Sequence, residues 1–446
     1  MIARAVGVGQ SRSRLAPRPE PFLSHPFIDL VKDPPTRRVW VGLSLQSIAE
    51  ELLRMAVIWL AIDMVGAAAS FLPAAQFIAA FVVSILIGAV ADRFSPRGTM
   101  VWVNLIRAGL ALLPVAMFLA DLLSFPMLML AAVAMSSLRG VYDPALQASV
   151  PKLAPSPGHM QAMNGLFDST HRMARLIGPF IGGFLSLVLP VIHFLTVTAI
   201  GYALSALAIR GVGRGLDVPH GIQGSAGVAG AIRRMLQGVT VARRDRPVGR
   251  ILIANSVNLF GWILGLTLGI PMLMASHPPS GFEDQPLVAL SCIIGAYGAG
   301  DFSSNIWVAN RYPADRWRFM FTGYLVLGLG TACLPLPIII GLGSWELPVM
   351  MAIGFIGGWG GPIFFLPMLT TLQTRVSGAD LAAVFRLRIA LTSGSMALSS
   401  LTGSWMFAGP GPIFTVIFAG LFMAATGCVG LLARPPEMSA AASKGA

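Results

Sequence analysis

The stretch that decides the fold is Gly88-Ala89-Val90-Ala91-Asp92-Arg93-Phe94-Ser95-Pro96-Arg97. An apolar run of about 20 residues comes before it, and a second such run begins directly after it. A run of that length crosses ~30 Å of hydrocarbon as a helix, so the charged stretch between the runs predicts a short loop joining two membrane helices. Barrel strands are excluded, since they need only about ten residues.

The composition of the 446-residue chain agrees with this interpretation. Hydrophobic residues make up 55% of the chain and charged residues only 11%, against about 25% charged in soluble domains. A disordered protein, a disulfide scaffold and a coiled coil are excluded. Cys292, Cys333 and Cys428 lie in apolar stretches without metal-ligand spacing, so we expect small core residues and no metal site.

The same hydropathy reading predicts an all-α membrane protein with twelve transmembrane helices. Gly, Pro and polar clusters separate the apolar stretches. The predicted spans are 39–65, 70–91, 98–121, 124–149, 160–188, 191–210, 249–275, 285–309, 318–340, 347–374, 380–407 and 411–433.

The positions of lysine and arginine predict the orientation. Five arginines lie deep inside the spans. The other Lys and Arg residues among the 31, including Arg375, Arg386 and Arg388 at the start of the eleventh span, fall on one side of the twelve-span chain. Cytoplasmic loops carry this excess, which places both termini in the cytoplasm. The net charge of +12 is therefore a topology signal, and the expected partner is the lipid bilayer and not a nucleic acid.

Five segments follow along the chain: a basic cytoplasmic tail (1–38), six spans (39–210), a cytoplasmic linker (211–248), six further spans (249–433) and a cytoplasmic C-terminal tail (434–446). Val90-Ala91-Asp92-Arg93-Phe94 ends the second span, and Val308-Ala309-Asn310-Arg311-Tyr312 ends the eighth. This match predicts two six-helix halves related by a parallel pseudo-repeat. Such halves provide alternating access to a site near the membrane midplane.

The loop of Gly88, Asp92, Arg93 and Arg97 resembles the loop 2–3 signature of the major facilitator superfamily, although Ser95 and Pro96 depart from it. The resemblance covers nearly the whole chain and implies a transporter. It also implies that this loop is a cytoplasmic gate, and the alternative is a basic loop that anchors the chain at the membrane.

A second motif lies in the fifth span, where Gly178-Pro179-Phe180-Ile181-Gly182-Gly183 resembles the core of the superfamily's antiporter motif. Plain close packing of helices is the alternative for these small residues. The flanking stretches 147–153 and 174–179 resemble the branch of siderophore exporters of the enterobactin type and macrolide efflux proteins. This implies efflux across a bacterial inner membrane.

Ionisable residues inside the first span are costly and therefore informative. Arg54 lies at i+4 from Glu50 and i+3 from Glu51, so it can pair with either carboxylate. One arginine neutralises one carboxylate fully, and the other becomes a candidate proton carrier. We favour Glu51 for this role. The alternative is a structural cluster in which all three groups satisfy one another.

The remaining ionisable residues of the predicted central cavity lie in other spans. Arg139 and Asp143 form an i, i+4 pair, and Asp168, Arg172 and Arg175 form one stripe, with His171 beside it and Asp301 in the eighth span. Arg107 either joins this network or extends to the cytoplasm. The excess of arginine favours an anionic or catechol-like substrate. Asn255, Asn258 and Asn305 are expected to give the second half a polar but nearly uncharged wall. Apolar cavity surface can come from Phe260, Trp262, Trp359 and Phe364, and a lipid-facing or core position is the favoured alternative for each of these four.

No nucleotide-binding, zinc-peptidase or CxxC motif occurs, so we expect no cofactor and no enzyme activity. Transport must then draw on an ion gradient, and protons fit the intramembrane carboxylates. The sequence predicts a monomeric, proton-coupled exporter of a small organic molecule, a siderophore-like metabolite or a drug. Proton-coupled uptake of a ferric siderophore or nutrient is one alternative, and a sensor or scaffold that does not transport is another.

Overall fold

The computed structural model describes residues 26–91, 95–154, 157–212, 228–309, 315–376 and 378–435, and all the regular structure in these ranges is helical. The first half contains α1 (Pro26–Lys32), α2 (Pro34–Val65), η1 (Gly66–Ser70), α3 (Phe71–Ala91), α4 (Pro96–Leu119), α5 (Phe125–Leu153), α6 (Pro157–Ser186) and α7 (His193–Arg210). The second contains α8 (Val228–Arg244), α9 (Arg246–Trp262), the π-helix η3 (Ile263–Gly269), α10 (Ile270–Ser276), α11 (Pro286–Ala309), α12 (Arg316–Cys333), α13 (Leu336–Ile340), η4 (Gly343–Trp345), α14 (Glu346–Arg375), α15 (Gly378–Ala408) and α16 (Pro412–Leu432).

Nine stretches of the described residues are long and apolar enough to cross a membrane. The twelve predicted spans therefore exceed what length and composition support in the structure. Helix α2 and most of α3 count as one stretch, because only the short η1 separates them. Helices α6 and α15 are outside the nine: α6 carries several charged residues, and α15 is rich in Ser, Thr and Gly.

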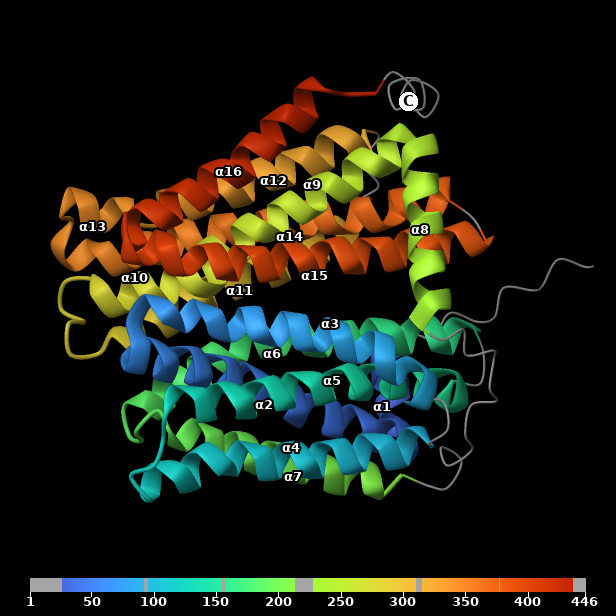
Figure 1. The fold of residues 1–446 in the computed structure, drawn as a ribbon, viewed down its shortest axis with the longest axis horizontal. Coiled ribbons are helices and arrows are strands. Elements are labelled where there is room, and N and C mark those ends of the chain that lie inside the picture. The colour runs from blue at the N-terminus through green and yellow to red at the C-terminus, as the bar shows by residue number, and fades with distance from the viewer. Residues whose placement is uncertain are drawn as a thin grey trace, which may run out of the picture.

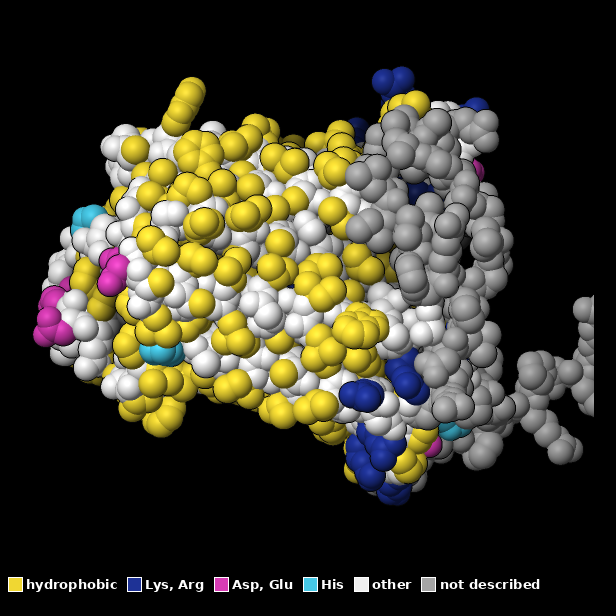
Figure 2. All heavy atoms as spheres, turned by 60° about the horizontal axis from the view of Figure 1, so that its bottom comes forward, with side chains coloured by type: hydrophobic (Ala, Val, Ile, Leu, Met, Phe, Trp, Pro, Cys, Tyr) yellow, Lys and Arg dark blue, Asp and Glu magenta, His cyan; other side chains and the backbone are white. Residues whose placement is uncertain are grey.

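The long helices run roughly side by side, as Figure 1 shows, with α2 to α7 below and α9 to α16 above. We call the end of the bundle that carries α1 and α8 the linker end, and the end that carries α13 and the α10–α11 connection the loop end. Lys and Arg gather at the linker end in Figure 2, whereas the middle of the face shown is largely hydrophobic.

Several helices that begin at the linker end share one local signal. Asp33, Ser95, Asp245 and Asp315 each accept a hydrogen bond from a backbone N–H three residues on. A capping side chain satisfies a backbone donor that has no partner within the helix. At the first three of these starts a proline follows within the first two helical positions, where its missing N–H costs nothing.

The two groups of helices pack in matching ways. Helix α4 packs between α5 and α7, and α12 packs between α14 and α16. Helix α2 contacts α6 and α7, whereas α9 contacts α15 and α16. Contacts between the two groups are formed mainly by α6 with α11 and by α3 with α15.

Each of the two groups of helices is held together internally by a different kind of interaction. In the second group, glycines bring backbones into contact: a Cβ on Gly323 would lie 2.8 Å from Gly360 O, and one on Gly328 would lie 2.3 Å from Ala424 N. Such close approach replaces the hydrophobic driving force, which does not act between helices in lipid. In the first group the corresponding centre is the buried carboxylate of Glu50, described below.

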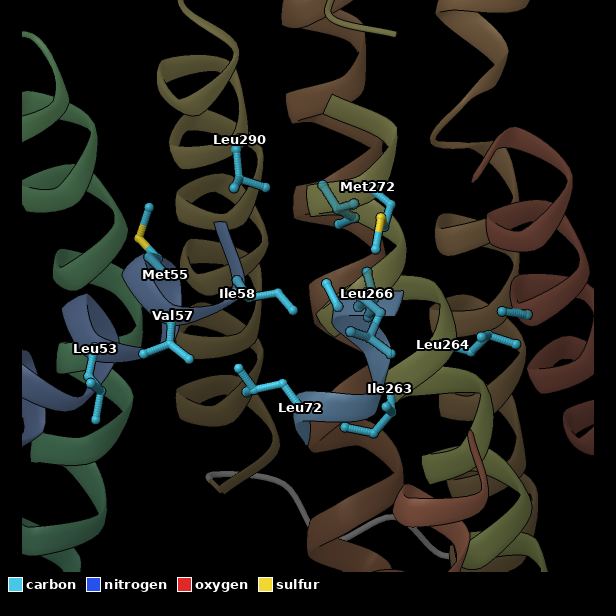
Figure 3. Packing of buried hydrophobic residues seen from close by; sticks show 14 of the residues in the cluster. Leu53, Met55, Val57, Ile58, Leu72, Ile263, Leu264, Leu266, Met272 and Leu290 are labelled. Atoms are coloured by element: carbon cyan, nitrogen blue, oxygen red, sulfur yellow. The ribbon is translucent and has the colours of Figure 1, made fainter. Parts of the chain in front are cut away.

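Apolar side chains from both groups meet near the loop end. In Figure 3, Ile58 of α2 and Leu72 of α3 lie opposite Leu266 and Ile263 of η3. Helices α6 and α11 are also in close contact there, since a Cβ on Gly183 would lie 2.7 Å from the Cβ of Ser291. The two groups are therefore packed against each other at the loop end.

Candidate functional site

A cavity of about 450 Å³ lies between the two groups of helices. This volume is in the range of sites that hold small organic molecules. Its lining comes from α2, α6, α9, η3, α10, α11, α12, α14 and α15. The residues are Glu51, Arg54, Met55, Ile58, Asp168, Arg172, Arg175, Pro179, Asn258, Leu259, Trp262, Leu266, Thr267, Ile270, Pro271, Leu290, Ile294, Tyr297, Gly298, Asp301, Leu327, Gly361, Pro362, Phe364, Phe365 and Met396.

One wall of the cavity is charged. Arg172 Nε lies 2.9 Å from Asp168 Oδ2, and its Nη1 lies 3.2 Å from Asp301 Oδ2. Arg175 Nη2 lies 4.0 Å from the same oxygen of Asp301. Because Asp301 belongs to α11 and the arginines belong to α6, these ion pairs join the two groups of helices.

The charged wall continues onto α2, where Arg54 Nη1 donates to Glu51 Oε2 at 2.9 Å. This is the i, i+3 pair that the sequence allowed. The Arg54 side chain is 45% exposed, whereas that of Glu51 is 12% exposed. The wall thus holds three carboxylates and three guanidinium groups, and protonation of any one carboxylate leaves it positive.

A second part of the lining, the aromatic wall, is almost uncharged. Trp262, Tyr297, Phe364 and Phe365 line it, and Trp262 Nε1 donates to the Tyr297 hydroxyl oxygen at 3.3 Å. Asn258 is buried in this wall, and neither its Oδ1 nor its Nδ2 has a hydrogen-bond partner among the described residues. Buried amides are rarely left unsatisfied, so a ligand is a natural partner for this side chain.

The glycine motif of α6 brings this helix against the charged wall. A Cβ on Gly178 would lie 2.5 Å from Glu51 Cβ, and one on Gly182 would lie 2.9 Å from Met55 Sδ. Pro179, between them, lines the cavity. Gly183 faces Ser291 of α11 instead. Gly178 and Gly182 therefore pack α6 against α2, and Gly183 packs it against α11, whereas Pro179 faces the cavity.

Glu50 does not line the cavity, although the sequence analysis grouped it with Glu51. Its carboxylate is buried and lies 2.9 Å from Arg107 Nη1 and 3.1 Å from Arg139 Nη1. Gln46 Nε2 donates to it at 3.2 Å. Arg107 also donates to the Tyr202 hydroxyl at 2.7 Å. Arg54 is thus not its partner, and Arg107 joins this network and does not extend to the cytoplasm.

Arg139 and Asp143 extend this network away from the cavity lining. Arg139 Nε lies 3.4 Å from Asp143 Oδ2, and the Asp143 side chain is 51% exposed. His171 has its Nδ1 2.8 Å from the carbonyl oxygen of Phe167 in its own helix, in line with a hydrogen-bonded packing role.

The predicted gate is only partly described. Gly88 lies in α3, and Arg97 Nη1 donates to the carbonyl oxygen of Val212 at 2.9 Å. Asp92 and Arg93 lie outside the described residues.

The structure adds groups that the sequence analysis missed. Tyr297 and Phe365 line the cavity, whereas Phe260, Trp359 and Asn305 do not. Arg388, which the sequence placed among the basic residues at the start of a span, contacts Phe365. The sequence held one signal that Arg388 lies near the cavity, namely its position eight residues inside the predicted span 380–407. Within the described residues, no group of three His, Cys, Asp or Glu side chains is arranged to hold a metal ion.

Comparisons with known proteins agree with this geometry. The family model described as Major Facilitator Superfamily matches residues 39–345. The fold is similar to that of a D-xylose–proton symporter, with a TM-score of 0.66 and 13% identity over 92% of this chain and 98% of that chain. It is also similar to a POT family transporter crystallised with a thioalcohol-conjugated peptide, with a TM-score of 0.64 and 14% identity over 90% of this chain and 96% of that chain. No curated protein sequence matches the chain.

Proposed function

The chain belongs to the major facilitator superfamily, and from this premise we propose that it is a proton-coupled exporter of a small organic molecule. It is a multi-pass membrane transporter and not an enzyme. The observation that carries the proposal is the cavity between the two groups of helices, whose charged wall contains an ion pair from one group to the other.

The proposed architecture is twelve spans in two six-helix halves. The matching packing of α2 to α7 and of α9 to α16 supports a parallel repeat, because the main helix contacts in one set have counterparts in the other. Such a pair of halves rocks about a central site. We further propose a monomer in a bacterial inner membrane. The basic residues at the linker end support cytoplasmic termini.

In this proposal Glu51 carries the proton. It lines the cavity, and its single arginine partner is half exposed, so protonation can break the pair without leaving a buried guanidinium behind. Glu50, by contrast, has two arginine partners away from the cavity, which supports a structural role. Gly178 holds α6 against Glu51, so a change at the carboxylate is passed directly to α6.

Asp301 and Arg172 act as the latch between the halves. Helices α6 and α11 are in contact from Gly183 and Ser291 at the loop end to this ion pair near the middle of both helices. Asp168, one turn nearer the linker end on α6, has a side chain that is 61% exposed. This pattern supports a state closed at the loop end, in which substrate reaches the charged wall from the cytoplasmic side. The loop of Gly88, Asp92, Arg93 and Arg97 is the proposed gate there.

The substrate in this proposal is an anionic or catechol-like molecule with an apolar body, as in siderophore-like metabolites and many drugs. Arg172 and Arg175 receive its charged end when a carboxylate of the wall is protonated. The aromatic wall receives its body, and Asn258 supplies hydrogen bonds. One proton moving down 100 mV provides about 2.3 kcal/mol for each cycle.

Proton-coupled uptake is the second candidate. The description of the similar structure as a D-xylose–proton symporter favours it. The two directions differ only in which side the substrate leaves, so a direct measurement decides between them.

The test is untargeted mass spectrometry of medium and cell extract from cells with the gene, without it and with the Glu51→Gln variant. Each culture is measured with and without a protonophore. A compound enriched outside only with the wild-type gene and an intact gradient supports export. Enrichment inside supports uptake. A profile that the gene does not change, under iron-replete and iron-starved growth alike, leaves two alternatives: a substrate that the host does not make, or a sensor or scaffold that does not transport.

A further inference from the structure

Arg388 is an arginine inside α15 without an acidic partner among the described residues. Its guanidinium carbon lies 5.8 Å from the ring centroid of Phe365 and 5.7 Å from that of Phe385. Its Nε is buried and has no hydrogen-bond acceptor in the part of the chain that the structure describes. The five arginines inside the first group of helices all have carboxylate partners. Arg388 therefore stands apart from them.

A second unsatisfied donor lies on α12. The hydroxyl of Tyr324 is fully buried and has no hydrogen-bond partner among the described residues. Its ring is connected to Arg388 through α14, because it stacks on Phe364, and the neighbouring Phe365 contacts the guanidinium. Two buried donors without an acceptor are unusual in a folded protein, and both would be satisfied by an oxyanion.

This pair of donors adjoins the cavity through two aromatic residues. Phe364 lines the cavity and stacks on Tyr324, with ring centroids 4.5 Å apart and an interplanar angle of 19°. Phe365 also lines the cavity and contacts Arg388. Arg388 is two turns closer to the linker end of α15 than Met396, another lining residue. The donors therefore lie at the linker-end margin of the aromatic wall.

We infer that Arg388 and Tyr324 form a second anion-binding subsite, which takes the carboxylate of an aromatic organic acid whose ring lies against Phe364 and Phe365. A guanidinium fork matches a planar carboxylate, which favours this group over a compact halide. The subsite differs from the charged wall, where Arg172 already forms an ion pair with Asp301. The inference rests on the proposed function only in that the acid bound here is the transported molecule.

Equilibrium binding to the purified full-length protein in nanodiscs, without a proton gradient, tests the subsite. The probes are 2-naphthoate and its neutral counterpart 2-naphthamide, followed by quenching of tryptophan fluorescence. The wild type is expected to prefer the carboxylate by roughly ten- to a hundredfold, the range for a hydrogen bond to a charged group. Arg388→Gln is expected to abolish this preference while 2-naphthamide still binds, and Arg388→Lys is expected to keep part of it.

Two further variants make the test specific. Arg386→Gln makes the same change at an exposed position two residues earlier and is expected to leave the preference intact. Tyr324→Phe removes only the hydroxyl and is expected to reduce the preference several-fold. Equal binding of both probes by the wild type, or an unchanged preference in Arg388→Gln, overturns the inference. Because no gradient is applied, these outcomes are independent of whether Glu51 couples transport to protons.

Discussion

Replacing Glu50 by Gln is expected to destabilise the fold, whereas the same replacement at Glu51 is expected to preserve stability and abolish gradient-driven transport. The two carboxylates are adjacent in α2, so the substitutions are chemically identical. Their surroundings differ: Glu50 is held by two arginines away from the cavity, and Glu51 faces the cavity with one half-exposed arginine.

The magnitudes follow from burial. Arg107 is 2% exposed, and loss of the Glu50 charge leaves its guanidinium with the Tyr202 hydroxyl and ring. Breaking a buried pair by removing one partner costs about 3–5 kcal/mol. Loss of the Glu51 charge leaves Arg54, whose side chain is 45% exposed, in contact with solvent, so breaking this pair costs about 0–1 kcal/mol.

Both quantities are measured on the same purified variants. Unfolding in mixed micelles gives the free energy, and proteoliposomes with an imposed proton gradient give concentrative transport of the compound found by mass spectrometry. Glu283→Gln, in the exposed α10–α11 connection, is the control for both assays. The reasoning is refuted if Glu51→Gln destabilises the protein as much as Glu50→Gln, or if Glu50→Gln is fully stable but inactive.

Three further predictions concern the cavity. Gly178→Ala should push α6 away from Glu51 and lower the free energy of unfolding by about 1–3 kcal/mol. The control is Gly109→Ala, where a Cβ has open space. This control should be neutral or should stabilise the protein by about 0.5–1 kcal/mol. Asp301→Asn should weaken the pair with Arg172. The equilibrium between the state closed at the loop end and the state with the halves apart should then shift toward the latter, roughly tenfold or more. Spin labels on α6 and α11 should show a larger long-distance population, and an unchanged distance distribution would contradict the latch. Glu51→Gln should also make substrate exchange without a gradient independent of external pH, and a pH profile equal to that of the wild type would assign the proton to another group.

Part of the site could be predicted because helix geometry fixes near neighbours. Residues three or four apart share a helix face, so the Arg139–Asp143 and Asp168–Arg172 pairs follow from spacing alone. For Arg54, spacing allowed both Glu50 and Glu51, and the structure selects Glu51. The membrane character of the fold also follows, because long apolar runs leave few alternatives.

The remaining features depend on how each helix is rotated and which helix it meets. Arg107 is 57 residues from Glu50, and Asp301 is 129 residues from Arg172. Periodicity along one helix contains no information on either pairing. The motif around Gly178 could be identified from the sequence, but its contact with Glu51 could not be predicted, because the two residues belong to different helices.

The glycine contacts of α12, α14 and α16 have a consequence for evolvability. Part of the cohesion in the second half comes from backbone atoms that touch, as at Gly323 and Gly328, and these contacts do not depend on the side chains that face the cavity. A partly exposed cavity side chain such as Phe365 can therefore change while these backbone contacts keep the half in shape. A protein with this fold can therefore evolve to bind a new substrate by changing a few aromatic residues of the cavity, while the glycines at the helix contacts stay the same.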